Sequence, residues 1–516
     1  MQKSKLLIIS VTVVLFYVTT AYASVNIPVN SSFYGDVNTL ISKGLIESNL
    51  SSTKPFTRAE AGRLVAEAIE ESEEKEVPTS AANLLDRMSK EYKDEISEAR
   101  APGSAPRTFL KPVDEFSVSY NFMDGPYSTF NNEGIDYYDG HNAMIQFQSM
   151  GRLWNVFSYY IEPMILYNQQ VGNVDGNDET EVRLHKGYIK FTTGDFEIAV
   201  GRDSLWWGPG YHGSLLISNN ARPFDMIKLS NERAVLLPWI FSYLGPFRFN
   251  LIFSRLDDDD HNITDAATGD DLSKPYLHGL RLNFKPHPLL EVGLSHLVMF
   301  GGEGRSTSFK DFFKIAYSNQ NRDGTTLESN QELAIDLALS IPNVDKFIPL
   351  ASSIKLYGEI GAEDTGTPPD RRAYLAGITL NDAFTVKGMQ LRVEYADLSP
   401  DSVPTAWYRH ASYPMSYKGR GFGHHAGSDS DDLFVELSQT FENSFSYKIG
   451  FDKERNGISQ TNIQEKYQYF LETGYDIDDR VDLTLRYAYE EINNSENIKD
   501  NKQKNHFIGI ELEYDF

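Results

Sequence analysis

The chain has 516 residues, a formal net charge of −25 and no cysteine. This acidic balance argues against nucleic acid as a partner, because the chain offers too little positive charge to neutralise a run of phosphates. It also disfavours an acidic polysaccharide unless divalent cations or local basic patches help. Aromatic residues make up 13% of the chain, which is high for a soluble enzyme and typical of a membrane β-barrel with two aromatic girdles.

The N-terminus has the pattern of a secretory signal. Lys3 and Lys5 precede an apolar run over residues 6–18, and Ala21-Tyr22-Ala23 supplies a cleavage signature. We expect residues 1–23 to be a signal peptide. Elsewhere the sequence lacks the run of about 20 apolar residues that a membrane helix needs, so the exported chain is either soluble or a β-barrel.

Residues 24–98 have helical spacing and predict a small periplasmic domain that plugs or braces the barrel. Thr57 and Glu60 form a capping box at the start of one predicted helix. Leu85, Met88 and Tyr92 lie on one face of a later helix. The stretch 99–113 contains three prolines and a glycine, and we expect it to be a linker.

From residue 114 to 516 the period of the sequence changes to two. In the last eleven residues, Ile508, Ile510 and Leu512 fall on one face, and Glu511 and Glu513 fall on the other. About eighteen such segments occur, many of them ~9–12 residues long, which is the length of a tilted strand that crosses a bilayer. The pattern predicts an all-β transmembrane barrel of about 18 antiparallel strands in the cell outer membrane.

The connections support the same architecture. Long connections follow odd-numbered strands, as at 204–223, 300–330 and 399–431, and short ones follow even-numbered strands, as at Thr193-Gly194. Barrels have this asymmetry, with long loops outside and short periplasmic turns. The segment 231–246 departs from it, because it should be a short turn and is long and apolar. The structural alternative is a large soluble β-sandwich.

Three segments carry a resemblance to a known family. They are 201–223 (GRDSLWWGPGYHGSLLISNNARP), 423–433 (GHHAGSDSDDL), and Tyr276 to Leu282 followed by Phe284, Pro286 and Leu290. Together they resemble the Wzi-type capsule-assembly proteins of Gram-negative outer membranes. The resemblance implies an 18-stranded barrel with an N-terminal helical bundle at the periplasmic end. It further implies a lectin-like role in holding capsular or other surface polysaccharide, without catalysis.

The helical segment also resembles one copy of an S-layer-homology repeat, through Phe33-Tyr34-Gly35-Asp36-Val37, Lys43-Gly44-Leu45-Ile46 and Pro55-Phe56-Thr57-Arg58-Ala59-Glu60. Such repeats grip cell-wall polymers, so peptidoglycan is a further expected partner. The alternative is a helical plug held only by its own apolar faces.

Two outer connections hold the candidate glycan-binding residues, because aromatic faces stack on sugar rings and planar polar groups bind hydroxyls and carboxylates. These candidates are Arg202, Trp206, Trp207, Tyr211, His212, Asn219, Asn220, Arg222, Trp407, Tyr408 and Arg409. The alternative is that the same residues pack the barrel mouth, since Gly208-Pro209-Gly210 sets tight turns there.

Two segments carry residue types that bind metal ions. The acidic run in 256–274 has no EF-hand spacing, and a solvated loop is favoured over calcium binding. His424, His425, Asp429 and Asp431 could bind a metal ion, but a hydrogen-bonded loop is favoured. We therefore expect no bound metal and no cofactor.

The sequence favours an outer-membrane lectin-like protein, a monomer surrounded by outer-membrane lipids, that attaches polysaccharide to the cell surface. A channel or porin for sugars or other small solutes is one rival, which barrel size allows and a helical plug argues against. An outer-membrane hydrolase is the other, with Ser214, His212, His424 or Asp431 as the residues to test. A nucleophile elbow, a His-Glu-x-x-His run and a phosphate loop are all missing from the sequence, although a spatial triad or a carboxylate pair of a glycosidase needs none of them. The family resemblance implies no catalysis, so we expect the chain not to be an enzyme.

Overall fold

The computed structural model describes residues 22–516 except 76, 171–178, 258–262, 265–268, 270, 319–323, 348, 364–370, 401–402, 442–443 and 479. The expected signal peptide therefore lies almost wholly outside the described residues. So do five of the aspartates in the acidic 256–274 loop.

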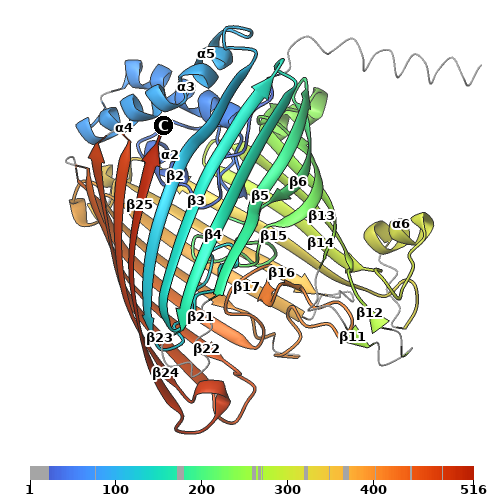
Figure 1. Cartoon of the computed structure of the whole chain (residues 1–516). Helices are drawn as coiled ribbons and strands as arrows, with labels where there is room; N and C mark the ends of the chain where they lie inside the picture. Colours follow the sequence, from blue (N-terminus) through green and yellow to red (C-terminus); the bar gives the residue numbers. More distant parts are fainter. Residues whose placement is uncertain are drawn as a thin grey trace, which may run out of the picture.

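Eighteen of the described strands form one closed antiparallel barrel (Figure 1), which confirms the predicted fold class. The strands are β2 (Phe109–Asp124), β3 (Gly140–Leu153), β4 (Phe157–Gln170), β5 (Glu179–Thr193), β6 (Phe196–Asp203), β8 (Phe224–Asn231), β10 (Pro246–Arg255), β13 (Tyr276–His287), β14 (Leu290–Phe300), β15 (Ser329–Ile341), β16 (Ser353–Glu363), β17 (Arg371–Asn381), β18 (Met389–Asp397), β21 (Ser430–Thr440), β22 (Phe445–Asn456), β23 (Gln464–Asp478), β24 (Val481–Asn493) and β25 (Lys502–Asp515). The barrel closes where β2 pairs with β25, with Glu115 opposite Asp515.

Successive side chains along each strand alternate between the outer and the inner face of the barrel wall. On β24, Leu485 points outward and is 45% exposed. Its neighbour Arg486 makes ion pairs with Glu472 and Glu511 of the flanking strands, at 2.8 and 2.9 Å. Apolar side chains thus cover the outside, and charged side chains pair across strands on the inside. This arrangement suits a barrel with lipid around it and a polar interior.

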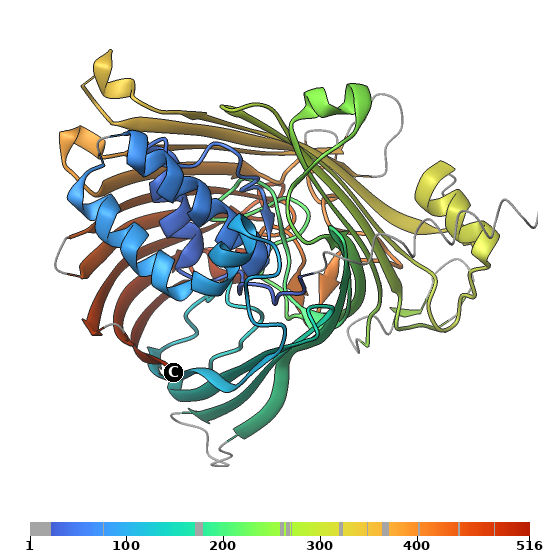
Figure 2. The same cartoon turned by 90° about the horizontal axis from the view of Figure 1, so that it is seen from above.

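The N-terminal domain lies across one end of the barrel, which we call the helical end (Figure 2). It consists of α2 (Phe33–Ser42), α3 (Arg58–Glu74), α4 (Thr79–Glu91) and α5 (Lys93–Arg100). Thr57 caps α3 by accepting a hydrogen bond from the Glu60 amide at 3.0 Å. The Glu60 side chain does not complete the expected capping box and pairs instead with Arg63.

The segment between the helices and the barrel is short. Since α5 ends at Arg100 and β2 begins at Phe109, the connection spans 101–108, which is shorter than the expected linker at 99–113. Pro112 lies inside β2, where the pairing with β3 shifts register between Lys111 and Glu115. A proline lacks the amide proton of a regular ladder and is tolerated at such an irregularity.

Connections at the helical end are mostly short, such as 194–195 and 288–289, and those at the opposite end are long. The exception remains 232–245, which contains β9 (Val235–Leu236) and the 3-10 helix η2 (Trp239–Leu244). Figure 2 shows η2 outside the ring of strands. Trp239 and Tyr243 on it are 81% and 85% exposed.

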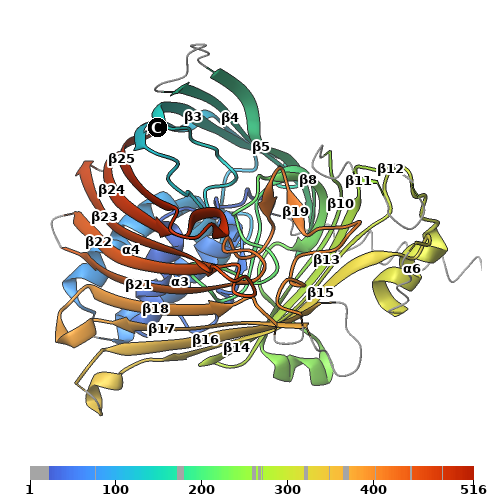
Figure 3. The same ribbon diagram turned by 90° about the horizontal axis from the view of Figure 1, so that it is seen from below.

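Two long connections of the opposite end fold back into the lumen, as seen from that end in Figure 3. The first, 204–223, contains β7 (Trp206–Trp207), and the second, 398–429, contains β19 (Ser416–Tyr417) and β20 (Arg420–Gly421). With inward residues of the wall they form one large apolar core, which includes Trp207, Leu216 and Trp407. We call these two segments the lumen loops.

The helical domain meets the first lumen loop inside the barrel. The short strand β1 (Thr53–Lys54) pairs with β7, with Thr53 opposite Trp207 and Lys54 opposite Trp206. The lumen is therefore occupied by chain segments that enter from both ends. The helical domain and the first lumen loop are joined there by the short β1–β7 ladder.

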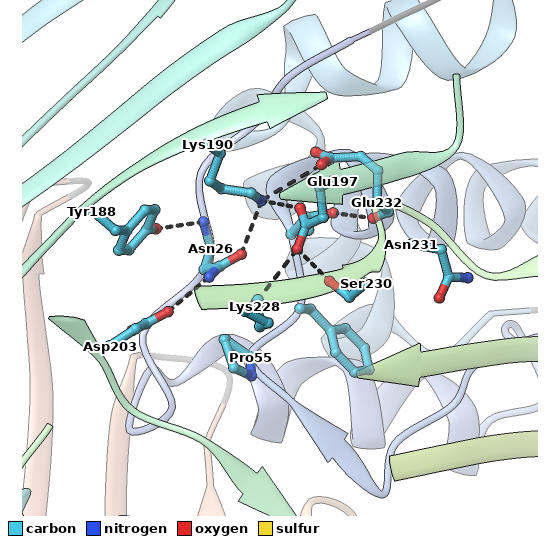
Figure 4. Close-up of polar contacts among 12 residues, drawn as sticks. Asn26, Pro55, Tyr188, Lys190, Glu197, Asp203, Lys228, Ser230, Asn231 and Glu232 are labelled. Carbon is cyan, nitrogen blue, oxygen red and sulfur yellow. Dashed lines mark hydrogen bonds and ion pairs between the residues drawn. The ribbon is translucent and has the colours of Figure 1, made fainter. Parts of the chain in front are cut away.

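The first described residues of the chain are bound to the inner wall near the helical end (Figure 4). The Asn26 amide donates to the Tyr188 hydroxyl at 2.8 Å, and its side chain donates to Asp203 at 2.7 Å. Lys190 donates to the Ser24 carbonyl at 2.7 Å. These contacts hold the segment before α2 against β5 and β6.

The remaining elements are peripheral to the lumen. They are β11 (Ile263–Thr264), β12 (Asp271–Leu272), α6 (Phe309–Ser318), η3 (Val344–Lys346), η4 (Ala383–Thr385) and η5 (Ser495–Asn497). Ile315 of α6 packs on Val298 and Phe300 of the wall.

Within the described part of the chain, the helices are all too short or too polar to cross a membrane.

Candidate functional site

The tryptophans of the first lumen loop are part of the packed interior. Trp206 and Trp207 are 4% and 1% exposed. The Trp207 amide donates to the Ile217 carbonyl at 2.9 Å, which folds the loop back on itself. This packing is the structural alternative that the sequence had left open for these two rings.

The second lumen loop places its aromatic residues against the first. Trp407 is fully buried and lies against Gly361, where a methyl group would approach the ring to 2.5 Å. Tyr408 donates its hydroxyl to the Leu215 carbonyl at 2.5 Å and accepts the His424 amide at 2.8 Å. Arg409, the next residue, is exposed.

Other candidates from the sequence are distributed around the wall. Arg202 lies on the outward face of β6 and pairs with Asp225 at 3.0 Å. Tyr211 faces the lumen, where its ring lies 3.4 Å from the Arg392 guanidinium carbon. Asn219 and Asn220 link the first lumen loop to neighbouring segments. The Asn219 carbonyl accepts the Glu133 amide at 2.7 Å, and the Asn220 side chain donates to the Gly421 carbonyl of the second lumen loop at 3.1 Å.

Arg222 lies at the end of the barrel away from the helices, on the rim of a pocket of about 280 Å³. The pocket is lined by Asp136, Tyr138, Leu166, Asn168, Thr180, Glu181 and Arg222. These residues come from the connection 125–139, the outer ends of β4 and β5, and the first lumen loop. We call this the mouth pocket.

Three arginines contact the two acids, Asp136 and Glu181, that line the mouth pocket. Arg222 contacts Asp136 at 3.2 Å and Glu181 at 3.4 Å. Arg183 reaches Glu181 at 3.1 Å, and Arg420 reaches Asp136 at 2.9 Å. The group therefore carries one positive charge in excess in a strongly acidic chain.

Polar atoms beside the mouth pocket lack partners among the described residues. Arg183 has two nitrogens, Nε and Nη2, that make no hydrogen bond within the described structure, and the Asn168 side-chain oxygen is also unpaired there. Buried polar atoms usually find a partner, so a polar ligand or water is expected. Sequence reasoning missed these residues, because apart from their place at strand ends they carry no motif.

Two further groups of acids and histidines lie inside the wall. In the first, Lys186 contacts Glu133 at 2.7 Å and Glu162 at 3.4 Å, and His185 contacts Glu133 at 2.9 Å. Burial alone would raise the pKa of the Glu133 carboxyl, but Lys186 and His185 hold that pKa well below its usual range. Lys186 thus lies between the two carboxylates of this group.

The second group joins both lumen loops to the wall. His212 and His425 lie beside Asp432 of β21 and Asp452 of β22. Burial lowers the pKa of the neighbouring His424 to about 3 and holds the pKa of His425 well below its usual range. Of the four residues that sequence reasoning had considered for a metal, Asp431 instead pairs with Arg455 and Asp429 binds Ser459.

The candidate nucleophile Ser214 has no histidine partner among the described residues. Its hydroxyl donates to the Trp207 carbonyl and lies 3.5 Å from Glu359. It is fully buried. These contacts fix the fold of the first lumen loop.

Comparison with known proteins gives concordant matches. The family model described as capsule assembly protein Wzi matches residues 124–507. An uncharacterised 55.8 kDa protein of the cps region of Klebsiella pneumoniae is 26% identical over 214 residues, 40% of this chain. The match spans only about two fifths of that relative's own length, 39%.

Among solved structures, the fold is similar to Wzi of Escherichia coli, an outer-membrane protein involved in group 1 capsule assembly and described as a carbohydrate-binding β-barrel. The TM-score is 0.70 at 18% identity, covering 95% of this chain and 99% of that one. OpdQ of Pseudomonas aeruginosa has a TM-score of 0.45 at 9% identity, covering 79% and 98%.

The family match and the apolar outer face of the barrel together place the chain in the outer membrane, with the helical end in the periplasm and the lumen loops entering from outside. The family model covers most of the chain and includes both lumen loops. The chain belongs to the capsule assembly protein Wzi family.

Proposed function

We propose that this protein attaches capsular or other extracellular polysaccharide to the cell surface by holding an acidic sugar in the mouth pocket, without catalysing a reaction. The observation that carries the proposal is the pocket itself, at the extracellular end, with Tyr138 and Arg222 on its lining. A Tyr ring can stack on a sugar, and a guanidinium can bind a carboxylate through two hydrogen bonds.

The charge around the pocket supports an acidic ligand. The net charge of −25 would repel a polyanion at long range. Arg183, Arg222 and Arg420 supply a local positive patch against that background, with Arg183 retaining unpaired donors within the described structure. A uronic acid or similarly charged residue has carboxylate oxygens that can accept hydrogen bonds from the Arg222 guanidinium on the pocket lining.

The family supports the polysaccharide class, and the description of Wzi from Escherichia coli as a carbohydrate-binding barrel supports a lectin-like mode. The surroundings of Ser214 support binding without hydrolysis. A contact of the helical domain with peptidoglycan, the monomeric state and the lipid contacts stay predictions.

The test compares Arg222→Ala with Arg202→Ala. Each carboxylate that Arg222 touches keeps a second arginine, since Asp136 keeps Arg420 and Glu181 keeps Arg183, so the pocket should survive the loss. Arg202 is equally a surface arginine in an ion pair but faces outward from β6.

We expect Arg222→Ala to weaken binding of the host cell's own capsular polysaccharide at least tenfold and to shift polymer from the cell-attached to the shed fraction. Arg202→Ala should do neither. Equal retention by both variants and the wild type would overturn the mouth pocket as the site.

A further inference from the structure

Four ligand-type side chains converge inside the barrel near its extracellular half. They are His212 of the first lumen loop, His425 of the second, Asp432 of β21 and Asp452 of β22. One ligand atom from each lies within 4.8 Å of every other. We call these residues the His–Asp cluster.

The spacing within the cluster is that of ligands around an ion rather than of hydrogen bonds. His212 Nε2 lies 3.4 Å from Asp432 Oδ2 and 3.6 Å from Asp452 Oδ2. His425 Nε2 lies 3.3 Å from Asp432 Oδ2. Two atoms bound at 2.0–2.2 Å to one tetrahedral ion stand about 3.3–3.6 Å apart, whereas N–H···O hydrogen bonds mostly span about 2.7–3.2 Å.

The ligand atoms of the cluster are buried and lack partners. The four side chains are between 1% and 5% exposed. Within the described residues, His212 Nε2, both nitrogens of His425 and all four oxygens of Asp432 and Asp452 make no hydrogen bond. Seven unpaired polar atoms at one point are unusual in a folded protein.

Two buried carboxylates, those of Asp432 and Asp452, share the cluster with the imidazoles of His212 and His425. The nearest lysine, Lys466, already pairs with Glu454 at 2.6 Å. A divalent cation would neutralise both aspartates, and burying them without one is costly.

Neighbouring rings fix the planes of the two histidines. Phe434 stacks on His212, with ring centres 3.9 Å apart and planes at 13°. Phe130 stacks on His425 at 4.1 Å and 14°. His424 lies beside the cluster, where its Nδ1 accepts the Ala426 amide at 3.3 Å and its Nε2 lies 3.6 Å from Asp432 Oδ2.

The group around Glu133, Glu162 and His185 makes the contrast clear. It has the same residue types and is also compact and buried. There, however, Lys186 supplies the positive charge, and its contact with Glu133 is a hydrogen-bond distance of 2.7 Å. A lysine ammonium group therefore already contacts both carboxylates of that group.

From these observations we infer that the His–Asp cluster is a structural site for a first-row divalent cation, with zinc as the best fit. Two imidazole nitrogens and two carboxylate oxygens form a closed tetrahedral set, which suits Zn²⁺ better than Ca²⁺ or Mg²⁺. This inference reverses the sequence-based expectation that no metal is bound. It is independent of the mouth pocket.

The site would join parts of the chain that are far apart. His212 and His425 belong to different lumen loops, and Asp432 and Asp452 belong to adjacent wall strands. A bound ion would fix both loops to the wall beneath the extracellular opening. The metal would therefore hold the fold of the lumen, with no open coordination position for chemistry.

The test uses the full mature chain in detergent, stripped with a chelator and then titrated with Zn²⁺ and, separately, with Co²⁺. We expect one Zn²⁺ per chain by elemental analysis and an intense visible Co²⁺ spectrum of the tetrahedral type. We also expect Zn²⁺ to raise the unfolding temperature of the stripped wild-type protein by several degrees.

Asp452→Asn is the test variant, and His185→Gln in the group that Lys186 contacts is the matched control. Asp452→Asn should weaken Zn²⁺ binding at least tenfold, and His185→Gln should leave one Zn²⁺ per chain. If the stripped wild type takes up no zinc, or if its Co²⁺ spectrum is the weak octahedral one, the inference is overturned regardless of how the variants fold.

Discussion

The Gly208 amide of the first lumen loop donates a hydrogen bond of 2.9 Å to the Ser52 carbonyl of the helical domain. Together with the pairing of β1 and β7, this bond connects a segment that enters from the periplasm to one that enters from outside. The two meet in the interior of the barrel, so the lumen is spanned by protein along its axis.

This meeting predicts a specific cross-link. The chain has no cysteine, so Lys54→Cys and Trp206→Cys would be the only thiols. They are directly opposed across the ladder, and opposed strand residues lie within the Cα separation that a disulfide spans. We expect oxidation to join them in most molecules, as detected by mass spectrometry of digested protein. Lys54→Cys with Trp239→Cys, on the exposed η2, should stay reduced, and equal yields would contradict the ladder.

The filled lumen predicts low conductance. Because the large apolar core and β1–β7 occupy the interior, purified protein in planar bilayers should show no large steady openings. Removing residues 204–223 should produce them, provided the variant keeps the heat-dependent gel shift of a folded barrel. Large steady openings of the wild type would favour the channel alternative.

The two faces of β24 predict opposite environments for adjacent residues. A nitroxide at Leu485→Cys should be broadened by oxygen, which concentrates in lipid, because Leu485 is 45% exposed on the outer face. A nitroxide at Arg486→Cys should be shielded from oxygen, because that side chain points inward to Glu472 and Glu511. Reversed accessibilities would contradict the wall described above.

The burial of Trp407 predicts that its truncation causes a large loss of stability. Its ring is fully buried in the lumen core and lies on Gly361. Trp407→Ala should lower the free energy of unfolding by roughly 3–5 kcal/mol, as for other large core truncations. Trp239→Ala, at 81% exposed, should change it by less than about 0.5 kcal/mol. Urea titration of both variants in one detergent measures the difference.

The burial of Lys54 predicts that the stability of the fold depends on pH. Burial, with Lys355 and Arg392 nearby, lowers the pKa of Lys54 to about 7, while the unfolded chain keeps about 10.4. Between about pH 7 and about pH 10.4, Lys54 is protonated in the unfolded state and neutral in the folded state. Stability therefore falls as the pH is lowered from about 10.4 to about 7, because the unfolded state takes up a proton that the folded state does not.

The matching variant is Lys54→Met. The stability of Lys54→Met relative to wild type should be greatest near pH 7 and should decline as the pH rises toward 10. Lys93→Met, at an exposed lysine of α5, should give a difference that does not vary with pH. A flat Lys54→Met profile would show that the charge is well solvated.

The strands could be predicted from sequence because their period is local. Alternation at Ile508, Ile510 and Leu512 is visible in eleven residues, and lipid enforces it in every strand. The inward folding of the lumen loops was not visible, since Trp206 or Trp407 on a long connection suits a sugar platform and a packed core equally well. Only the partner side chains, hundreds of residues away, decide between them.

The His–Asp cluster shows the same limit. Sequence adjacency suggested Asp429 and Asp431 beside the histidine pair, but β21 begins at Ser430. On a strand, neighbours face opposite sides, so Asp432 looks into the lumen and Asp431 does not. The alternation of side chains along β21 could have identified Asp432 as the inward-facing aspartate. The approach of His212 and Asp452 could not be predicted, because it depends on how the first lumen loop folds and on how the barrel closes.

The binding of Ser24 and Asn26 to the inner wall has a consequence for biogenesis. These residues precede every strand, yet their partners Tyr188, Lys190 and Asp203 belong to β5 and β6. This segment must therefore be seated before β2 and β25 pair and close the barrel, or be threaded in afterwards. Closure of this barrel in the membrane is thus coupled to the placement of a segment that belongs to none of its strands.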